Sequence, residues 1–167
     1  MVAYYWQSSM NSVANLLPIL EKDYPDIKFI PGKTFAWSPR KGVIMYTSHQ
    51  ANSDHGVWAL LHEVAHATLK HKDCNNDFDL LKLERTTWEQ ACEIGKKYGI
   101  SIDNEHIQDC LDTYRDWLHD RASCPNCKVV SLQRQDGLYK CFNCKTAWQV
   151  SNSRRSLITR KTIIENK

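Results

Sequence analysis

The chain has no hydrophobic run long enough to cross a membrane, because no part of its 167 residues approaches about 18 consecutive apolar residues. Residues 1–6 also lack the positively charged and apolar segments of a signal peptide. Internal repeats and low-complexity segments are absent as well. The missing apolar run excludes a transmembrane helix, and we expect a soluble, cytoplasmic protein with no membrane partner.

The cysteines do not suit a disulfide framework. There are 7 of them, an odd number, and four form two CxxC pairs. Such pairs favour a metal site in a reducing compartment over disulfides. The remaining three, Cys74, Cys92 and Cys110, are expected to be free thiols that pack as ordinary small residues.

Charge divides the chain into two parts. Residues 1–120 carry 12 Lys and Arg against 17 Asp and Glu, whereas residues 121–167 carry 10 against 2. All 7 histidines lie in the acidic part and all four paired cysteines in the basic part. We therefore predict a first domain over residues 1–121, a small module over 122–150 and a basic tail over 151–167.

Hydrophobic spacing predicts helices separated by short strands in the acidic part. The expected helices cover residues 8–22, residues from about 54 to about 71, residues from about 78 onward, and residues 103–121. The expected strands cover residues 27–30, 35–37 and 42–47.

The second expected helix contains the motif HExxH, formed by His62, Glu63 and His66. A helix turns about 100° per residue, so the two histidines lie one turn apart on one face and can bind the same zinc ion. Glu63 beside them can hold a metal-bound water and take its proton, which predicts hydrolysis of peptide bonds. The alternative is a chance pattern on a buried helix.

A catalytic zinc usually has three protein ligands. His71 follows His66 by five residues and would point about 140° away on a continuous helix, so we interpret it as a residue of the helix C-terminus. Glu84 falls in the middle of the apolar stripe of the next helix, where a buried carboxylate needs a metal or a salt-bridge partner. Glu84 is therefore the better candidate, and Glu89 lies outside the stripe.

Three segments resemble the ImmA/IrrE-type metallopeptidases, which are small zincins: residues 42–47, the HEVAHATLKH helix and residues 84–91. That family has Glu-x-x-Ala-Asn-x-x-Ala on the helix after HExxH, and its first Glu is the third zinc ligand. Glu84 matches this ligand and Ala91 the final Ala. Thr87 and Trp88 stand in place of Ala and Asn, which keeps Glu89 open as an alternative ligand.

The resemblance implies an α+β fold, with a minimal zincin of helices packed on a small sheet. It also implies regulatory proteolysis of a protein substrate, for example a DNA-binding regulator. The strand at residues 43–47 would be a sheet edge that pairs with the peptide. The candidates for oxyanion stabilisation are Tyr46, His49, His55 and His106.

The basic part contains the four-cysteine pattern of a small β zinc ribbon, with Cys124 and Cys127 followed, after thirteen residues, by Cys141 and Cys144. Four thiolates can surround one structural zinc, which then holds together a module too small to have its own core. Lysines occupy the position after each pair where Gly is common. We therefore predict two zinc ions, one catalytic and one structural.

The ribbon and the tail are rich in basic and aromatic residues. With Tyr139, Phe142 and Trp148, they could bind a nucleic-acid backbone and stack on bases. The alternative, which we favour slightly, is a solvated tail on a ribbon whose aromatic residues form its core.

Three functions remain open from the sequence. The first is a zinc endopeptidase in which the ribbon selects a protein substrate. The second is a DNA-associated protease of the SprT-like group, which takes its third ligand from a further histidine, here His106 or His119. The third is a non-catalytic zinc-ribbon module that binds nucleic acid or protein.

Overall fold

The computed structural model describes residues 12–47, 53–72, 74, 76–151 and 158–164. The chain divides into two compact units: unit 1 comprises residues 1–72 and 85–107, and unit 2 comprises residues 73–84 and 108–167. Two long helices, α4 (Asp77–Lys97) and α5 (Asn104–Ala122), contribute residues to both units. In the described part of the chain, no helix is both long and apolar enough to span a membrane.

Unit 1 contains a three-stranded sheet in the order β1 (Lys28–Pro31), β3 (Val43–Tyr46), β2 (Ala36–Ser38). β3 pairs with β1 in parallel and with β2 in antiparallel orientation. The prediction that β3 is an edge strand is therefore wrong. Val43 and Ile44 are buried, as expected of a strand with a neighbour on each side, and β1 and β2 are the outer strands of the sheet in the part of the chain that the structure describes.

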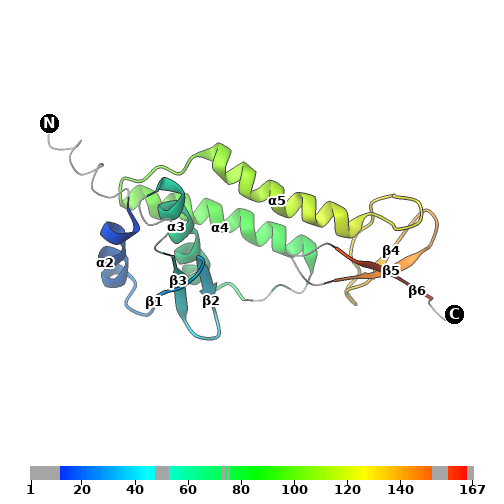
Figure 1. Ribbon diagram of the computed structural model, residues 1–167, viewed down its shortest axis with the longest axis horizontal. Helices are drawn as coiled ribbons and strands as arrows, with labels where there is room; N and C mark the ends of the chain where they lie inside the picture. Colours follow the sequence, from blue (N-terminus) through cyan, green and yellow to red (C-terminus); the bar gives the residue numbers. More distant parts are fainter. Residues whose placement is uncertain (1–11, 48–52, 73, 75, 152–157, 165–167) are drawn as a thin grey trace. The chain divides into compact units, whose positions relative to one another are not determined.

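Two helices accompany this sheet in unit 1, α2 (Val13–Asp23) and α3 (Asp54–Thr68) (Figure 1). Each begins at a serine whose side chain accepts a hydrogen bond from a backbone N–H of the first turn, Ser12 in α2 and Ser53 in α3. Their fully buried side chains form the core of the unit together with the central strand; they include Leu16, Leu20, Ile44, Leu60, Leu61 and Val64.

The end of α3 differs from the prediction of a helix that continues to His71. The helix ends at Thr68, and Lys70 adopts a positive φ of 54°. The Lys70 N–H then donates to the Ala67 carbonyl at 3.1 Å and the His71 N–H to the His66 carbonyl at 3.0 Å. These two hydrogen bonds form a Schellman motif, which reverses the chain and brings His71 back toward the last turn of the helix.

Unit 2 contains a second sheet, with the order β4 (Tyr139–Lys140), β5 (Ala147–Val150), β6 (Arg160–Ile163). All its pairs are antiparallel. β6 comes from the segment predicted as a basic tail. The core of this unit is small, and its fully buried residues include Cys124, Cys141 and Trp148.

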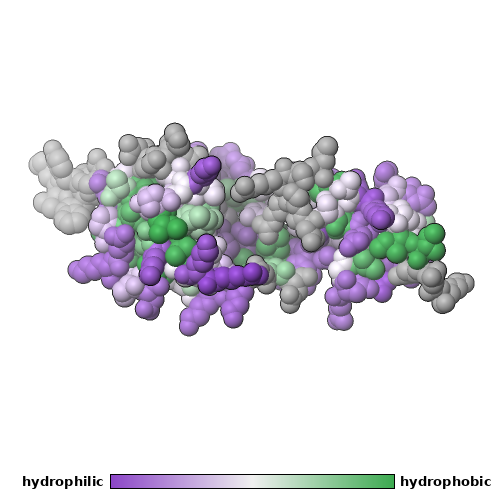
Figure 2. Space-filling model, turned by 60° about the horizontal axis from the view of Figure 1, so that its bottom comes forward, coloured by the Kyte–Doolittle hydropathy of each residue, from purple (hydrophilic) through white to green (hydrophobic). Residues whose placement is uncertain are grey.

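Apolar side chains also reach the surface, in patches separated by hydrophilic residues (Figure 2). Among the described residues, the exposed large apolar side chains are those of Ile30, Phe78, Val130, Leu132, Phe142 and Ile164. All except Ile30 belong to unit 2. A unit with so small a core cannot bury all its apolar side chains, which agrees with a fold stabilised by a metal.

Candidate metal centres

The HExxH motif lies on α3, and its two histidines converge. Nε2 of His62 is 3.0 Å from Nε2 of His66, and their rings stand at 86° to each other. An ion about 2.1 Å from each nitrogen fits between them. His62 is buried and packs against the indole of Trp88, with 4.2 Å between the ring centroids, so its ring orientation is constrained by packing.

Glu84, on α4, completes this group. One ligand atom from each of His62, His66 and Glu84 lies within 4.8 Å of the others, so the three side chains could hold a metal ion. Glu84 is only 4% exposed. Glu89, the alternative ligand, is exposed and pairs with Arg85 at 2.9 Å.

The donor set suits a catalytic zinc. Two imidazole nitrogens and one carboxylate are the ligands of one common class of such sites, in which the fourth position takes water. Burial of a carboxylate is costly without a compensating charge, and a cation beside Glu84 would supply that charge. The residues present therefore fit a zinc ion on both chemical and electrostatic grounds.

Glu63 is held by β2. The Trp37 N–H donates to Oε2 of Glu63 at 2.6 Å, and the Trp37 indole N–H donates to the His71 carbonyl at 3.2 Å. Because the Trp37 N–H donates to Glu63, this N–H points away from β3, the strand that pairs with β2 among the described residues. No sequence pattern signals this role, since Trp37 is 26 residues from Glu63.

Two of the candidates for oxyanion stabilisation contact each other. The rings of His55 and His106 stack at 4.7 Å, and His106 also contacts Trp88. Tyr46 is half-buried on β3. His49 lies outside the described residues.

Comparison of the chain with protein-family models, with curated proteins and with solved structures finds no match. The resemblance to the ImmA/IrrE-type metallopeptidases therefore stays a prediction. The function is therefore inferred from the geometry of the two candidate metal centres.

The four paired cysteines form the second candidate centre, the four-cysteine centre. Sγ of Cys124 is 3.6 Å from Sγ of Cys144, and Sγ of Cys127 is 3.4 Å from Sγ of Cys141. All four sulfur atoms lie within 4.8 Å of one another and could hold a metal ion. Hydrogen bonds from the hydroxyl and the backbone N–H of Thr146 lower the pKa of Cys144 to about 5, which favours the thiolate that binds metals.

The lysine after each cysteine pair has the backbone conformation of a glycine. Lys128 has a φ of 63° and Lys145 a φ of 62°. The N–H of each lysine donates to the carbonyl of the first cysteine of its pair, at 3.0 Å for Lys128 and 3.1 Å for Lys145. The two turns are thus alike, although both lack the usual Gly.

The aromatic residues of the ribbon divide between core and surface. Tyr139 and Trp148 are 1% and 0% exposed and stack on each other, whereas Phe142 is 68% exposed. Of these three, only Phe142 is therefore available for stacking on a base. The two buried rings belong to the small core, as in the alternative favoured from the sequence, but residues 160–163 of the tail pair with β5 and do not form the solvated tail of that alternative.

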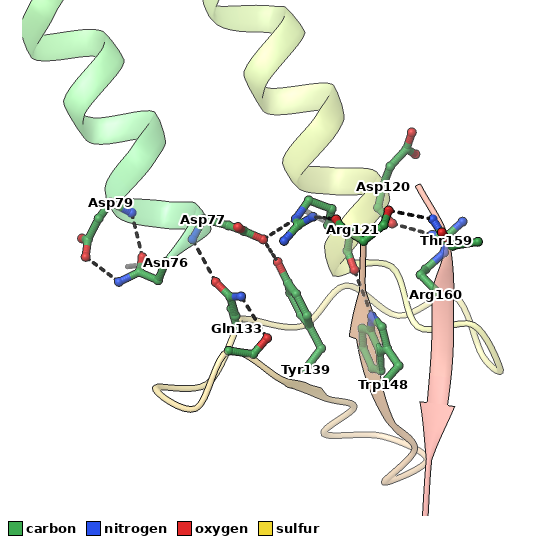
Figure 3. A network of polar contacts seen from close by, with 12 residues as sticks. Asn76, Asp77, Asp79, Asp120, Arg121, Gln133, Tyr139, Trp148, Thr159 and Arg160 are labelled. Atoms are coloured by element: carbon green, nitrogen blue, oxygen red, sulfur yellow. Dashed lines mark hydrogen bonds and ion pairs between the residues drawn. The ribbon is translucent and has the colours of Figure 1, made fainter. Parts of the chain in front are cut away.

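A buried polar network joins the ribbon to the first turn of α4 within unit 2 (Figure 3). Oδ2 of Asp77 pairs with Nε of Arg121 at 2.6 Å and accepts a hydrogen bond from the Tyr139 hydroxyl. The Asp77 N–H donates to Gln133, and the Trp148 indole N–H donates to the Arg121 carbonyl. Burial and the Asp77 carboxylate raise the pKa of Tyr139.

The three remaining cysteines form no disulfide. Burial raises the pKa of Cys92 and of Cys110, so both are thiols at neutral pH. Neither has the lowered pKa of a reactive cysteine, which agrees with the expectation of ordinary packing residues.

Proposed function

We propose that the protein is a zinc-dependent metalloendopeptidase that hydrolyses peptide bonds of a protein substrate. The observation that carries this proposal is the convergence of His62, His66 and Glu84, with Glu63 on the same helix as the two histidines. A zinc ion bound there would polarise the scissile carbonyl and lower the pKa of a bound water. The four-cysteine centre would hold a second, structural zinc.

Glu63 is the general base of this mechanism. Its carboxylate would take the proton of the attacking water and then pass it to the leaving amine. The hydrogen bond from the Trp37 N–H holds one carboxylate oxygen of Glu63, Oε2, at 2.6 Å. The backbone of β2 thus orients the base.

The substrate would bind along β2, which replaces β3 as the expected edge strand. Among the described residues, β2 is an outer strand of the sheet, and the N–H of Trp37 on its outer edge points to Glu63. An extended peptide that pairs with this edge would pass beside the base and gain main-chain hydrogen bonds. Such pairing uses the peptide backbone and does not select a substrate class, so a DNA-binding regulator is proposed from the family resemblance alone.

The presence of Glu84 in the group supports this proposal over a SprT-like site. In such a site, a histidine would take the place of Glu84. His106 instead stacks on His55, and neither His106 nor His119 joins a metal-binding group among the residues that the structure describes.

Metal analysis tests the proposal first. We expect two zinc ions per chain in the wild type, and one in His62→Ala and in Glu84→Ala, because each variant removes a ligand of the same ion. Arg85→Ala, on an exposed side of the same helix as Glu84, is the matched control and should keep both. One zinc in all four proteins would refute the catalytic site.

Cleavage of a peptide library then separates a peptidase from a binding module. Glu63→Gln should retain two zinc ions and lose cleavage, since the amide cannot take the proton. Equal cleavage by Glu63→Gln and wild type would contradict the proposed mechanism.

A further inference from the structure

Three polar atoms meet on the side of His66 that faces away from His62. Nδ1 of His66 lies 3.1 Å from Nδ1 of His71 and 3.4 Å from the hydroxyl of Thr87. The Thr87 hydroxyl is in turn 3.1 Å from Nδ1 of His71. Thr87 is fully buried and His71 is partly buried, so these contacts are shielded from solvent.

Binding of a metal through Nε2 of His66 determines which ring nitrogen of His66 carries the hydrogen. A neutral imidazole that offers the lone pair of Nε2 carries its hydrogen on Nδ1, which must then donate to an acceptor. Nδ1 of His71 is the nearer of the two partners, and it is reached either directly or through the Thr87 hydroxyl. When His71 accepts at Nδ1, by either route, its own hydrogen lies on Nε2.

The backbone around His71 keeps this acceptor in position. The Schellman motif at Lys70 turns the chain, and the His71 N–H donates to the His66 carbonyl at 3.0 Å. The Trp37 indole N–H donates to the His71 carbonyl at 3.2 Å. Both backbone groups of His71 are thus anchored, one to α3 and the other to β2.

We propose that His71 is a positioning residue that orients His66 as a metal ligand, through a hydrogen bond from Nδ1 of His66 to Nδ1 of His71. This inference rests on the proposed metal site and assigns the residue that supports one of its ligands. His71 does not bind the metal itself. It fixes the tautomer and the ring plane of His66 and makes Nε2 of His66 a better donor.

The size of the effect follows from comparable contacts. Loss of a hydrogen-bond partner of a ligating histidine typically lowers metal affinity by about 10- to 100-fold. We therefore expect His71→Leu, which fills similar space without an acceptor, to weaken zinc binding at the His62–His66–Glu84 site by this factor. In His71→Asn, Oδ1 can occupy nearly the position of Nδ1, so affinity should stay within about threefold of the wild type.

The experiment is a zinc competition titration of the full chain against a chromophoric chelator, at one fixed pH. Zinc in the four-cysteine centre is counted separately, by its release on thiol modification. His119→Leu, a substitution of an exposed histidine, is the matched control and should leave both affinities unchanged. Cobalt substitution gives a second readout, because the visible bands of cobalt at the His/Glu site should shift in His71→Leu and not in His71→Asn.

Each outcome decides a different point. Weakening by His71→Leu together with rescue by His71→Asn supports the proposal. Unchanged affinity in His71→Leu overturns it, and equal weakening in both variants overturns it in favour of a packing role. If the wild type binds no zinc outside the four-cysteine centre, the proposed function fails as well, and this result is seen before any variant is made.

Discussion

Substitution of Arg121 by Met should destabilise unit 2 far more than the loss of a surface ion pair. The Arg121 and Asp77 side chains are 4% and 10% exposed, and the charged atoms are 2.6 Å apart. At an effective dielectric constant of about 20, this separation corresponds to an attraction of about 6 kcal/mol. Desolvation offsets much of it in the wild type, but Arg121→Met leaves the Asp77 carboxylate buried without its cation, which costs about 3–5 kcal/mol.

The chain provides a matched control for this prediction. Arg115 and Asp112 form an ion pair on the part of α5 that belongs to unit 2, and their side chains are 44% and 60% exposed, so Arg115→Met should cost about 0.2–1 kcal/mol. The double variant Asp77→Leu/Arg121→Met removes both charges and should be more stable than Arg121→Met alone.

Urea unfolding, monitored through the release of zinc from the four-cysteine centre, measures the stability of unit 2 directly. With an m-value of about 2 kcal/mol/M, Arg121→Met should lower the midpoint by about 1.5–2.5 M. A shift as small as that of Arg115→Met would contradict this prediction, because it would mean that the Asp77 carboxylate does not depend on Arg121 for its charge compensation.

Three other features can be tested by substitution: the Tyr139 contact, the turn at Lys70 and the four-cysteine centre. Because the pKa of Tyr139 is raised in the folded state, unit 2 should lose stability as the pH rises above the unfolded-state pKa of about 10. In a series of urea midpoints measured at increasing pH, Tyr139→Phe should therefore show a smaller decrease at alkaline pH than the wild type. Equal decreases in the two proteins would contradict the role of the Asp77 contact. Lys70→Gly should raise the free energy of unfolding of unit 1 by roughly 1 kcal/mol, since glycine adopts the positive φ of 54° without strain. Lys70→Val should lower this free energy. Equal urea midpoints in the two variants would show that the positive φ of Lys70 does not strain the chain. Cys124→Ser should lose the ribbon zinc and make residues 122–150 sensitive to proteolysis, with the zinc of the His62–His66–Glu84 site retained; a variant that keeps both ions would disprove the assignment of the four-cysteine centre.

Local patterns were sufficient to predict most of the elements of the two candidate centres. The i and i+4 spacing of His62 and His66, the position of Glu84 in an apolar stripe and the two CxxC pairs are all features of short segments. In the structure these residues form the two groups that could hold metals. Helix periodicity places His62 and His66 on one face, and a tight turn brings the two cysteines of each pair together, whereas Glu84 comes from a different helix.

The features that sequence analysis missed depend on contacts between distant residues or on unusual turns. β3 is central because it pairs with both β1 and β2, and a run of apolar residues alone does not distinguish a central strand from an edge strand. The contact of His71 with His66 requires a left-handed residue at Lys70, where the usual Gly signal is absent. The pair of Asp77 and Arg121 joins residues 44 apart in the chain, and neither has a neighbouring signal.

The network at Asp77 also bears on how the chain could be divided or recombined. Asp77 and Glu84 lie on the same helix two turns apart, about 10 Å along its axis, and both belong to unit 2. A fragment cut after residue 121 would lose Tyr139 and Gln133, the partners of the first turn of α4. The ribbon differs in charge from the rest of the chain and contains all four paired cysteines, but it is therefore not an independent module. Transferring it to another protein, or replacing it by another ribbon, would require the first turn of α4 to be transferred with it.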